Sequence, residues 1–245
     1  MELLRFYCNP IVGPVVELSA AEARHLALVR RLVVGDEVEL FDGVGTLAVG
    51  VIRTASNRKV TLDVRETRVL PKPKRPQIVI AASVAKGERF EWLIGKCTEL
   101  GVDRICPVLF ERTVKQAKNP KVNERWDNLA VSAAKQCRRV FLPQMDKPAP
   151  LTKAVETLSK EYPNAKFLLG SLSDSAQPLI DREFGSGDIV ALVGPEGGLT
   201  EEEEALLQSY GCQAVRLTDT VLRIETAGVA FAAVLAARRN AQESK

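Results

Sequence analysis

A strand, a glycine-rich turn and a helix start follow one another between Ile189 and Glu203. The run Ile189–Val193 is short, apolar and rich in β-branched residues, which is typical of a buried strand. The next residues, Gly194–Gly198, include three glycines and a proline, and glycine allows both positive φ and close approach of a ligand to the backbone. Thr200 and Glu203 form a capping box, which predicts that a helix begins there. This order places a loop at the carboxyl end of a strand, where open α/β sheets bind ligands.

The loop differs from the standard nucleotide-binding loops. The chain contains no Gly-x-x-x-x-Gly-Lys-Ser/Thr, and Gly43-Val44-Gly45 and Gly185-Ser186-Gly187 both lack the third glycine of a dinucleotide fingerprint. The acidic run Glu201–Glu204 would repel a polyphosphate, although acidic residues also suit the first turn of a helix. Taken alone, the pentapeptide is equally compatible with a tight turn that binds nothing.

Charge is unevenly distributed along the 245 residues. The net charge is +3, and the balance of basic over acidic residues is +3 for residues 1–76, +5 for 77–147 and −5 for 148–245. A basic front and middle with an acidic end predict an anionic partner on one side of the molecule.

Composition also limits the classes of site. The five cysteines are scattered through the chain: Cys8, Cys97, Cys106, Cys137 and Cys212. The absence of a Cys-x-x-Cys argues against a zinc site or a disulfide framework and fits a reducing cytoplasm. The longest apolar run, Ala227–Ala237, is too short to cross a bilayer. We therefore expect a cytoplasmic protein with no metal and no membrane partner.

The first 70 residues have the pattern of a small β domain. Four short, mostly alternating segments are typical of strands: Val15–Leu18, Glu37–Phe41, Leu47–Ile52 and Val60–Val64. A capping box at Ser19 and Glu22 predicts one helix over Ala23–Leu32. Pro71–Pro76 holds three prolines in six residues, which favours an extended linker. We therefore predict a β-barrel over residues 1–71 and a second domain over 72–245.

Strands and helices alternate after the linker. The expected strands are Ile78–Val84, Ile105–Leu109, Phe167–Leu169 and Ile189–Val193. The expected helices are Glu88–Leu100, Asn123–Arg139, one from Thr200 and one over Thr226–Arg239. This alternation predicts an α/β fold, a mostly parallel sheet with helices on both faces.

Two motifs together are more specific than any single one. Gly194-Pro-Glu-Gly-Gly198, followed by Val221-Leu-Arg-Ile-Glu-Thr-Ala227, resembles the RsmE family. These are bacterial methyltransferases of the SPOUT superfamily that use S-adenosylmethionine to methylate N3 of a uridine in 16S ribosomal RNA. Shorter matches follow in family order: Phe6, His25, Val29, Arg31, Gly35-Asp36, Phe41–Gly43, Lys86, Lys96, Glu99–Val102, Glu111-Arg112, Gln136, Arg139 and Pro143.

The resemblance implies a SPOUT-type sheet with a C-terminal trefoil knot, preceded by a PUA-like RNA-binding β-barrel. It also implies a homodimer whose substrate is 16S rRNA or the assembled small subunit. Three residues depart from the family pattern: Lys135, where Glu is usual, Arg138, where Gly is frequent, and Thr218, where Gly is normal. The first two add positive charge, and Thr218 is expected to narrow the adenine pocket.

Site residues follow from the motifs. Backbone groups of glycine loops hold adenine and ribose without side chains, so we assign the cofactor to Leu169, Gly170, Gly194, Pro195, Glu196, Gly197, Gly198, Leu217, Thr218, Val221 and Leu222. We assign Arg223 and Glu196 to catalysis. Arg223 cannot act as a base, but it suits stabilisation of charge developing on a uracil carbonyl. An ion pair with Glu225 or Glu196 that merely shapes the loop is an equally good reading.

Basic residues concentrate between 112 and 139, including Lys115 and Lys118. The predicted RNA contacts are Arg5, Arg31, Lys86, Arg112, Lys135, Arg138 and Arg139. Such residues neutralise phosphates, although a solvated basic helix face is the common alternative. Two other functions stay open, namely a SPOUT enzyme acting on a ribose 2′-hydroxyl or a guanine, and a non-catalytic assembly factor that binds RNA.

Overall fold

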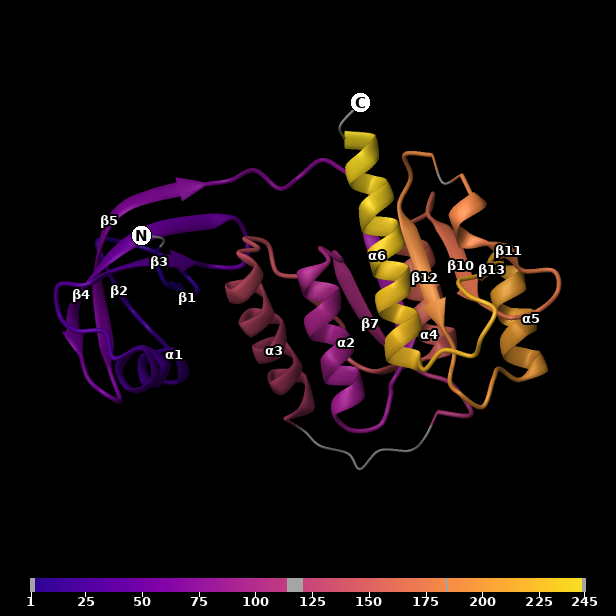
Figure 1. Cartoon of the computed structure of the whole chain (residues 1–245), viewed down its shortest axis with the longest axis horizontal. Helices are drawn as coiled ribbons and strands as arrows, with labels where there is room; N and C mark the ends of the chain where they lie inside the picture. The colour runs from indigo at the N-terminus through magenta and orange to yellow at the C-terminus, as the bar shows by residue number, and fades with distance from the viewer. Residues whose placement is uncertain (1–2, 114–120, 184, 244–245) are drawn as a thin grey trace. The chain divides into compact units, whose positions relative to one another are not determined.

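The computed structural model describes residues 3–113, 121–183 and 185–243 (Figure 1). The chain divides into two compact units. The first combines Met1–Pro73 with Val131–Leu142, and the second combines Lys74–Ala130 with Pro143–Lys245.

The first unit is a small, mostly antiparallel sheet. Its strands are β1 (Arg5–Tyr7), β2 (Val15–Glu17), β3 (Glu37–Phe41), β4 (Thr46–Ala55) and β5 (Val60–Val69), in the order β1-β3-β4-β5-β2. Only the ladder between β1 and β3 is parallel among those described. Alternate residues such as Phe6, Leu40 and Leu62 fill its core, so the predicted β domain with its alternating strands is confirmed.

The helix of this unit changes character along its length. Ser19 caps α1 (Ala20–Arg24) by accepting a hydrogen bond from the Glu22 amide at 3.3 Å. The chain then continues as the π-helical segment η1 (His25–Arg30) and ends at Arg31, whose φ is 55°. The predicted helix over Ala23–Leu32 therefore begins earlier than expected, because Ser19 itself is the N-cap.

Residues 131–142 complete this unit. The Leu142 amide donates to the Gly43 carbonyl at 2.8 Å, and Val44 and Phe141 form an isolated antiparallel bridge. A Cβ at Gly45 (φ +124°) would lie 2.9 Å from the Phe141 ring. A glycine is therefore required where this segment meets the sheet.

The second unit contains an eight-stranded sheet in which every described ladder is parallel. Its order is β11-β13-β10-β12-β6-β7-β8, and β9 also pairs with β7. The strands are β6 (Ile78–Ser83), β7 (Arg104–Leu109), β8 (Gln144–Met145), β9 (Ala149–Pro150), β10 (Lys166–Gly170), β11 (Gln177–Pro178), β12 (Ile189–Val193) and β13 (Gln213–Arg216). The strands β6 and β12 are buried along their whole length and almost entirely apolar, as expected for a sheet covered on both faces.

Helices cover both faces of this sheet. Side chains of α2 (Glu88–Glu99) and α6 (Ile224–Glu243), with Trp126 and Ala130 of α3 (Val122–Cys137), form one core with it. Side chains of α4 (Leu151–Glu161) and α5 (Glu201–Ser209) form the other. Figure 1 shows α6 running beside α2 and β12. The predicted α/β architecture is confirmed, although α4 and the strands β8, β9, β11 and β13 were not expected. No helix among the described residues is long and apolar enough to span a membrane.

Candidate functional site

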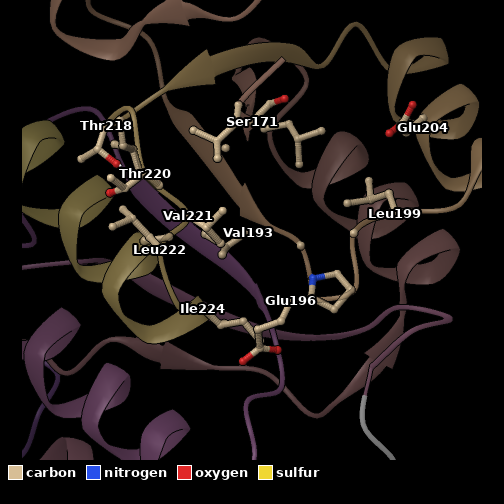
Figure 2. A pocket seen from close by; sticks show the side chains of 18 residues that line it. Ser171, Val193, Glu196, Leu199, Glu204, Thr218, Thr220, Val221, Leu222 and Ile224 are labelled. Atoms are coloured by element: carbon tan, nitrogen blue, oxygen red, sulfur yellow. Dashed lines mark hydrogen bonds between the residues drawn. The ribbon is translucent and has the colours of Figure 1, made fainter. Parts of the chain in front are cut away.

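Three loops meet at the carboxyl ends of neighbouring parallel strands. One leaves β12 at Gly194, one leaves β10 at Ser171, and the third connects β13 to α6 through residues 217–223. Together they enclose a cavity of about 290 Å³ (Figure 2). This is the end of the sheet at which the order of strand, glycine turn and helix predicts a ligand.

Most residues assigned to the cofactor line this cavity. They are Leu169, Gly170, Gly194, Pro195, Glu196, Gly198, Leu217, Thr218, Val221 and Leu222. Gly197 is not among the lining residues, and a Cβ placed on it would lie 3.4 Å from Cβ of Arg112. The loop therefore turns most of its residues toward the cavity and Gly197 away from it.

Eight further lining residues escaped the assignment from sequence: Ser171, Leu172, Val193, Leu199, Glu204, Thr220, Ile224 and Ala227. Most are immediate neighbours of assigned residues. Glu204 is different, because it lies in the first turn of α5. From the sequence, the acidic run Glu201–Glu204 was interpreted only as acidic residues suited to a helix start. In Figure 2, Leu199 and Glu204 lie across the cavity from Thr218 and Thr220.

The lining suits a cofactor that combines an uncharged ring with positive charge. Backbone and apolar side chains make most of the wall, and Glu196 and Glu204 contribute carboxylates. S-adenosylmethionine carries an uncharged adenine, a cationic sulfonium, and an ammonium and a carboxylate at its methionine end, so its net charge is positive and these residues fit it. A polyphosphate would meet two carboxylates.

The glycines of the site also satisfy packing. A Cβ at Gly194 would lie 2.5 Å from Cδ1 of Leu199, and one at Gly170 would lie 3.1 Å from the Phe231 ring. Any larger residue at Gly194 therefore has to displace Leu199, which is itself part of the wall.

The capping box predicted after the glycine loop is present in full. The Thr200 hydroxyl accepts from the Glu203 amide at 3.3 Å, and the Thr200 amide donates to Oε2 of Glu203 at 3.0 Å. The second carboxylate oxygen of Glu203 accepts from the Glu111 amide at 2.8 Å. This one side chain therefore caps α5 and ties it to the turn after β7.

The two residues assigned to catalysis have different surroundings. Glu196 lines the cavity and pairs with Arg89 at 3.3 Å. Arg223 is exposed just before α6, and no hydrogen bond or ion pair engages its side chain within the described part of the chain. Neither of the ion pairs considered from sequence, Arg223 with Glu225 or with Glu196, forms among the described residues. Glu225 is buried and one of its carboxylate oxygens has no hydrogen-bond partner there, and Glu196 pairs with Arg89. Arg223 thus stands between two lining residues, Leu222 and Ile224, without lining the cavity itself.

Thr218, the departure from the family pattern, does line the cavity. Its hydroxyl donates to the Thr220 carbonyl at 3.0 Å. The hydroxyl of Thr218 therefore forms a hydrogen bond within its own loop.

The residues assigned to RNA fall into two groups. Arg31 and Lys86 are exposed, and Arg112 donates to carbonyls of the glycine loop. Lys115 and Lys118 lie outside the described residues. The others make contacts inside the first unit.

These inner contacts are ion pairs and backbone hydrogen bonds. Lys135 pairs with Glu22 at 2.5 Å, and both side chains are largely buried. Arg5 pairs with Glu39 at 2.6 Å, and Arg138 reaches the same carboxylate at 3.3 Å. Arg139 donates to the Phe141 carbonyl and accepts at its own carbonyl from Arg5.

The described residues contain no group of three histidine, cysteine or acidic side chains able to hold a metal ion. The described cysteines are free thiols, and burial raises the pKa of Cys106 and of Cys212 to about 12. These two thiols are therefore poor nucleophiles at neutral pH.

Comparison with known families assigns both parts of the chain. Residues 72–236 match the model of an RNA methyltransferase domain, and residues 18–65 match that of an RNA methyltransferase PUA domain. Ribosomal RNA small subunit methyltransferase E of Mycobacterium bovis is 32% identical over 241 residues, covering 96% of this chain and 92% of the relative.

Solved structures agree with this assignment. A putative methyltransferase from Legionella pneumophila, in complex with the bound cofactor SAM, superposes with a TM-score of 0.87 at 27% identity, covering 97% of this chain and 98% of that one. The ribosomal RNA small subunit methyltransferase E from Neisseria gonorrhoeae, bound to S-adenosyl methionine, gives 0.84 at 29% identity with the same coverage. Matching in both sequence parts and along nearly its whole length, the chain belongs to the ribosomal RNA small subunit methyltransferase E family.

Proposed function

We propose that this chain methylates N3 of a uridine in 16S ribosomal RNA of the small subunit. The observation that carries the proposal is the cavity that Gly194–Gly198 and residues 217–222 build together at the carboxyl ends of β10, β12 and β13. Relatives with this fold bind S-adenosylmethionine, and that cofactor supplies the methyl group.

The chain's own residues have separate tasks in this proposal. Backbone groups of the glycine loop and of residues 217–222 hold adenine and ribose, and the carboxylates of Glu196 and Glu204 face the positive charge. Arg223 is exposed beside the lining, and no hydrogen bond or ion pair engages its side chain among the described residues. Its task is to neutralise the negative charge on a carbonyl of the uracil whose N3 is deprotonated and accepts the methyl group. Arg89 holds Glu196 in place through its ion pair.

RNA binding is proposed for the PUA-like domain, residues 1–71, and for the methyltransferase domain, residues 72–245. Arg31, Lys86 and Arg112 are exposed basic residues of the assigned set. Arg112 donates to carbonyls of the glycine loop, so Arg31 and Lys86 are the two that we expect to meet phosphates. Arg5, Lys135 and Arg138 would act on RNA indirectly, by fixing the segment they anchor.

We further propose a homodimer formed through a knotted C-terminal segment. Support comes from α6, which carries alanine or valine at positions 229, 230, 233 and 237, all partly or fully exposed. A helix apolar around much of its circumference is typical of burial on several sides. Light scattering at micromolar concentration tests this, and a monomer mass would refute it.

Mass spectrometry of rRNA nucleosides tests the activity. Deleting the gene should remove one 3-methyluridine from 16S rRNA, and the parent gene should restore it, whereas a gene encoding Arg223→Met should not. If the nucleoside that disappears is instead a 2′-O-methylated nucleoside or a methylguanosine, the chain methylates a different target atom. No change in any nucleoside would favour the assembly factor. Supplying naked 16S rRNA and intact small subunits in parallel identifies the substrate form.

A further inference from the structure

We propose that Arg112 is a positioning residue that holds the glycine loop in its cofactor-binding shape. This rests on the proposed function, because it takes S-adenosylmethionine as the ligand of that loop. The Nη1 atom of Arg112 donates to the Gly197 carbonyl at 2.9 Å and to the Leu199 carbonyl at 3.1 Å. The two carbonyls flank Gly198, whose φ is +75°, so the cation spans the one residue of the loop with a left-handed backbone.

The turn that carries Arg112 is itself anchored on both sides. The Glu111 amide donates to Glu203 of α5 at 2.8 Å. The Thr113 hydroxyl forms a hydrogen bond of 3.0 Å with Ser83, which is fully buried at the end of β6, and accepts from the Phe110 amide at 2.8 Å. Because its neighbours are tied to a helix and to a strand, Arg112 presents its guanidinium from a fixed point.

The stem of Arg112 covers the outer side of the loop. A Cβ placed on Gly197 would lie 3.4 Å from Cβ and 3.5 Å from Cδ of Arg112. Gly197 is the member of Gly194–Gly198 that does not line the cavity. The loop is thus held between the arginine on one side and the ligand cavity on the other.

This geometry predicts a defined role in binding. Without the guanidinium, the carbonyls of Gly197 and Leu199 lose a charged donor, and the loop must be ordered when the cofactor binds. Such ordering weakens binding without changing the chemical step. Arg112 touches the loop rather than the reacting atoms, so its loss acts on KM.

The test compares Arg112→Met, which keeps the apolar stem, with Arg112→Lys, which keeps one charged donor. We expect Arg112→Met to raise both the Kd for S-adenosylmethionine and its KM about tenfold, with kcat at saturating cofactor unchanged. Arg112→Lys should recover part of the loss. Hydrogen exchange of peptides covering 194–200 should be faster in Arg112→Met, in the absence of cofactor as well.

Arg125→Met is the matched control, because Arg125 is an exposed arginine that pairs with Glu91 at 2.7 Å. It should leave cofactor binding unchanged. Thermal unfolding of all variants reports whether the fold is retained, and the exchange experiment locates any loosening in the loop or elsewhere.

The outcomes separate this assignment from its alternatives. Weaker RNA binding with a smaller salt dependence, at unchanged cofactor Kd, would make Arg112 a phosphate contact and overturn the proposal. Equal cofactor binding by the parent and Arg112→Met would also overturn it, while leaving the proposed function intact. A parent protein that binds no S-adenosylmethionine would overturn both.

Discussion

The glycine-loop cavity and the segment 131–142 show how differently two functional assignments translate into structure. Nearly all residues assigned to the cofactor meet around one cavity. By contrast, Lys135 and Arg138, assigned to RNA, pair with Glu22 of α1 and Glu39 of β3 in their own unit. The role of a glycine loop follows from its backbone conformation and could be predicted from the sequence. The role of a charged side chain depends on which carboxylate the fold brings next to it.

The largest effect should come from breaking the buried pair in the first unit. Lys135→Met leaves Glu22 buried without its partner, so we expect the free energy of unfolding to fall by about 3 kcal/mol in urea titrations. The double variant Lys135→Met/Glu22→Leu should recover much of that loss.

Lys160→Met is the control for this comparison, because Lys160 pairs with Glu156 at a similar distance of 2.6 Å but in solvent. No measurable change in stability is expected there. Equal losses at the two lysines would show that burial does not distinguish them.

Adding a side chain inside the cavity wall, with no change of charge, should weaken cofactor binding. In Gly194→Val the added atoms collide with Leu199, so we expect binding of S-adenosylmethionine to weaken about ten- to hundredfold by calorimetry. Gly95→Val is the control, since no atom of the described residues lies within 4 Å of the Cβ position at Gly95. Unchanged binding in Gly194→Val would place the cofactor elsewhere.

The salt dependence of RNA binding sharpens the contrast between exposed and paired cations. Arg31→Gln removes an exposed charge, so the log–log slope of affinity against salt should decrease by about one unit. Arg138→Gln removes a charge that pairs with Glu39 and should leave the slope nearly unchanged. A smaller slope in Arg138→Gln and an unchanged slope in Arg31→Gln would show that Arg138 is a direct phosphate contact.

The smallest effect concerns a local carboxylate in the first unit. Asp42 is buried, which opposes ionisation, but its bonds to the Thr46 side chain and to the amides of Val44, Thr46 and Gly45 lower its pKa. A lowered folded-state pKa stabilises the fold above the unfolded value of about 4, and this contribution disappears as pH falls through the folded value. Asp42→Asn should therefore flatten the acid side of the stability profile by less than about 1 kcal/mol. An identical profile in the variant would contradict this.

Local patterns were sufficient for much of the fold. Most of the longer strands, the alternation after residue 76 and the capping box at Thr200 and Glu203 could be predicted, because each depends on residues within a few positions of one another. The strands β1 and β13 were not predicted. The helix α4 was not predicted, although its buried residues Leu151, Ala154, Val155 and Leu158 have helical spacing. The strands β8, β9 and β11, at two residues each, are too short to carry any periodic pattern.

The sequence by itself determined that a glycine loop follows a buried strand and that a second loop motif precedes the last helix. Only the tertiary structure decided that these loops enclose one cavity, that Glu204 joins them, and that Gly197 faces Arg112 instead. It also decided that residues 131–142 cluster with the first unit and that Lys135 meets Glu22. The physical reason is range. Backbone conformation and capping are set by neighbours along the chain, whereas the partner of a charge is set by packing between segments as far apart as Glu22 and Lys135, which no local pattern records.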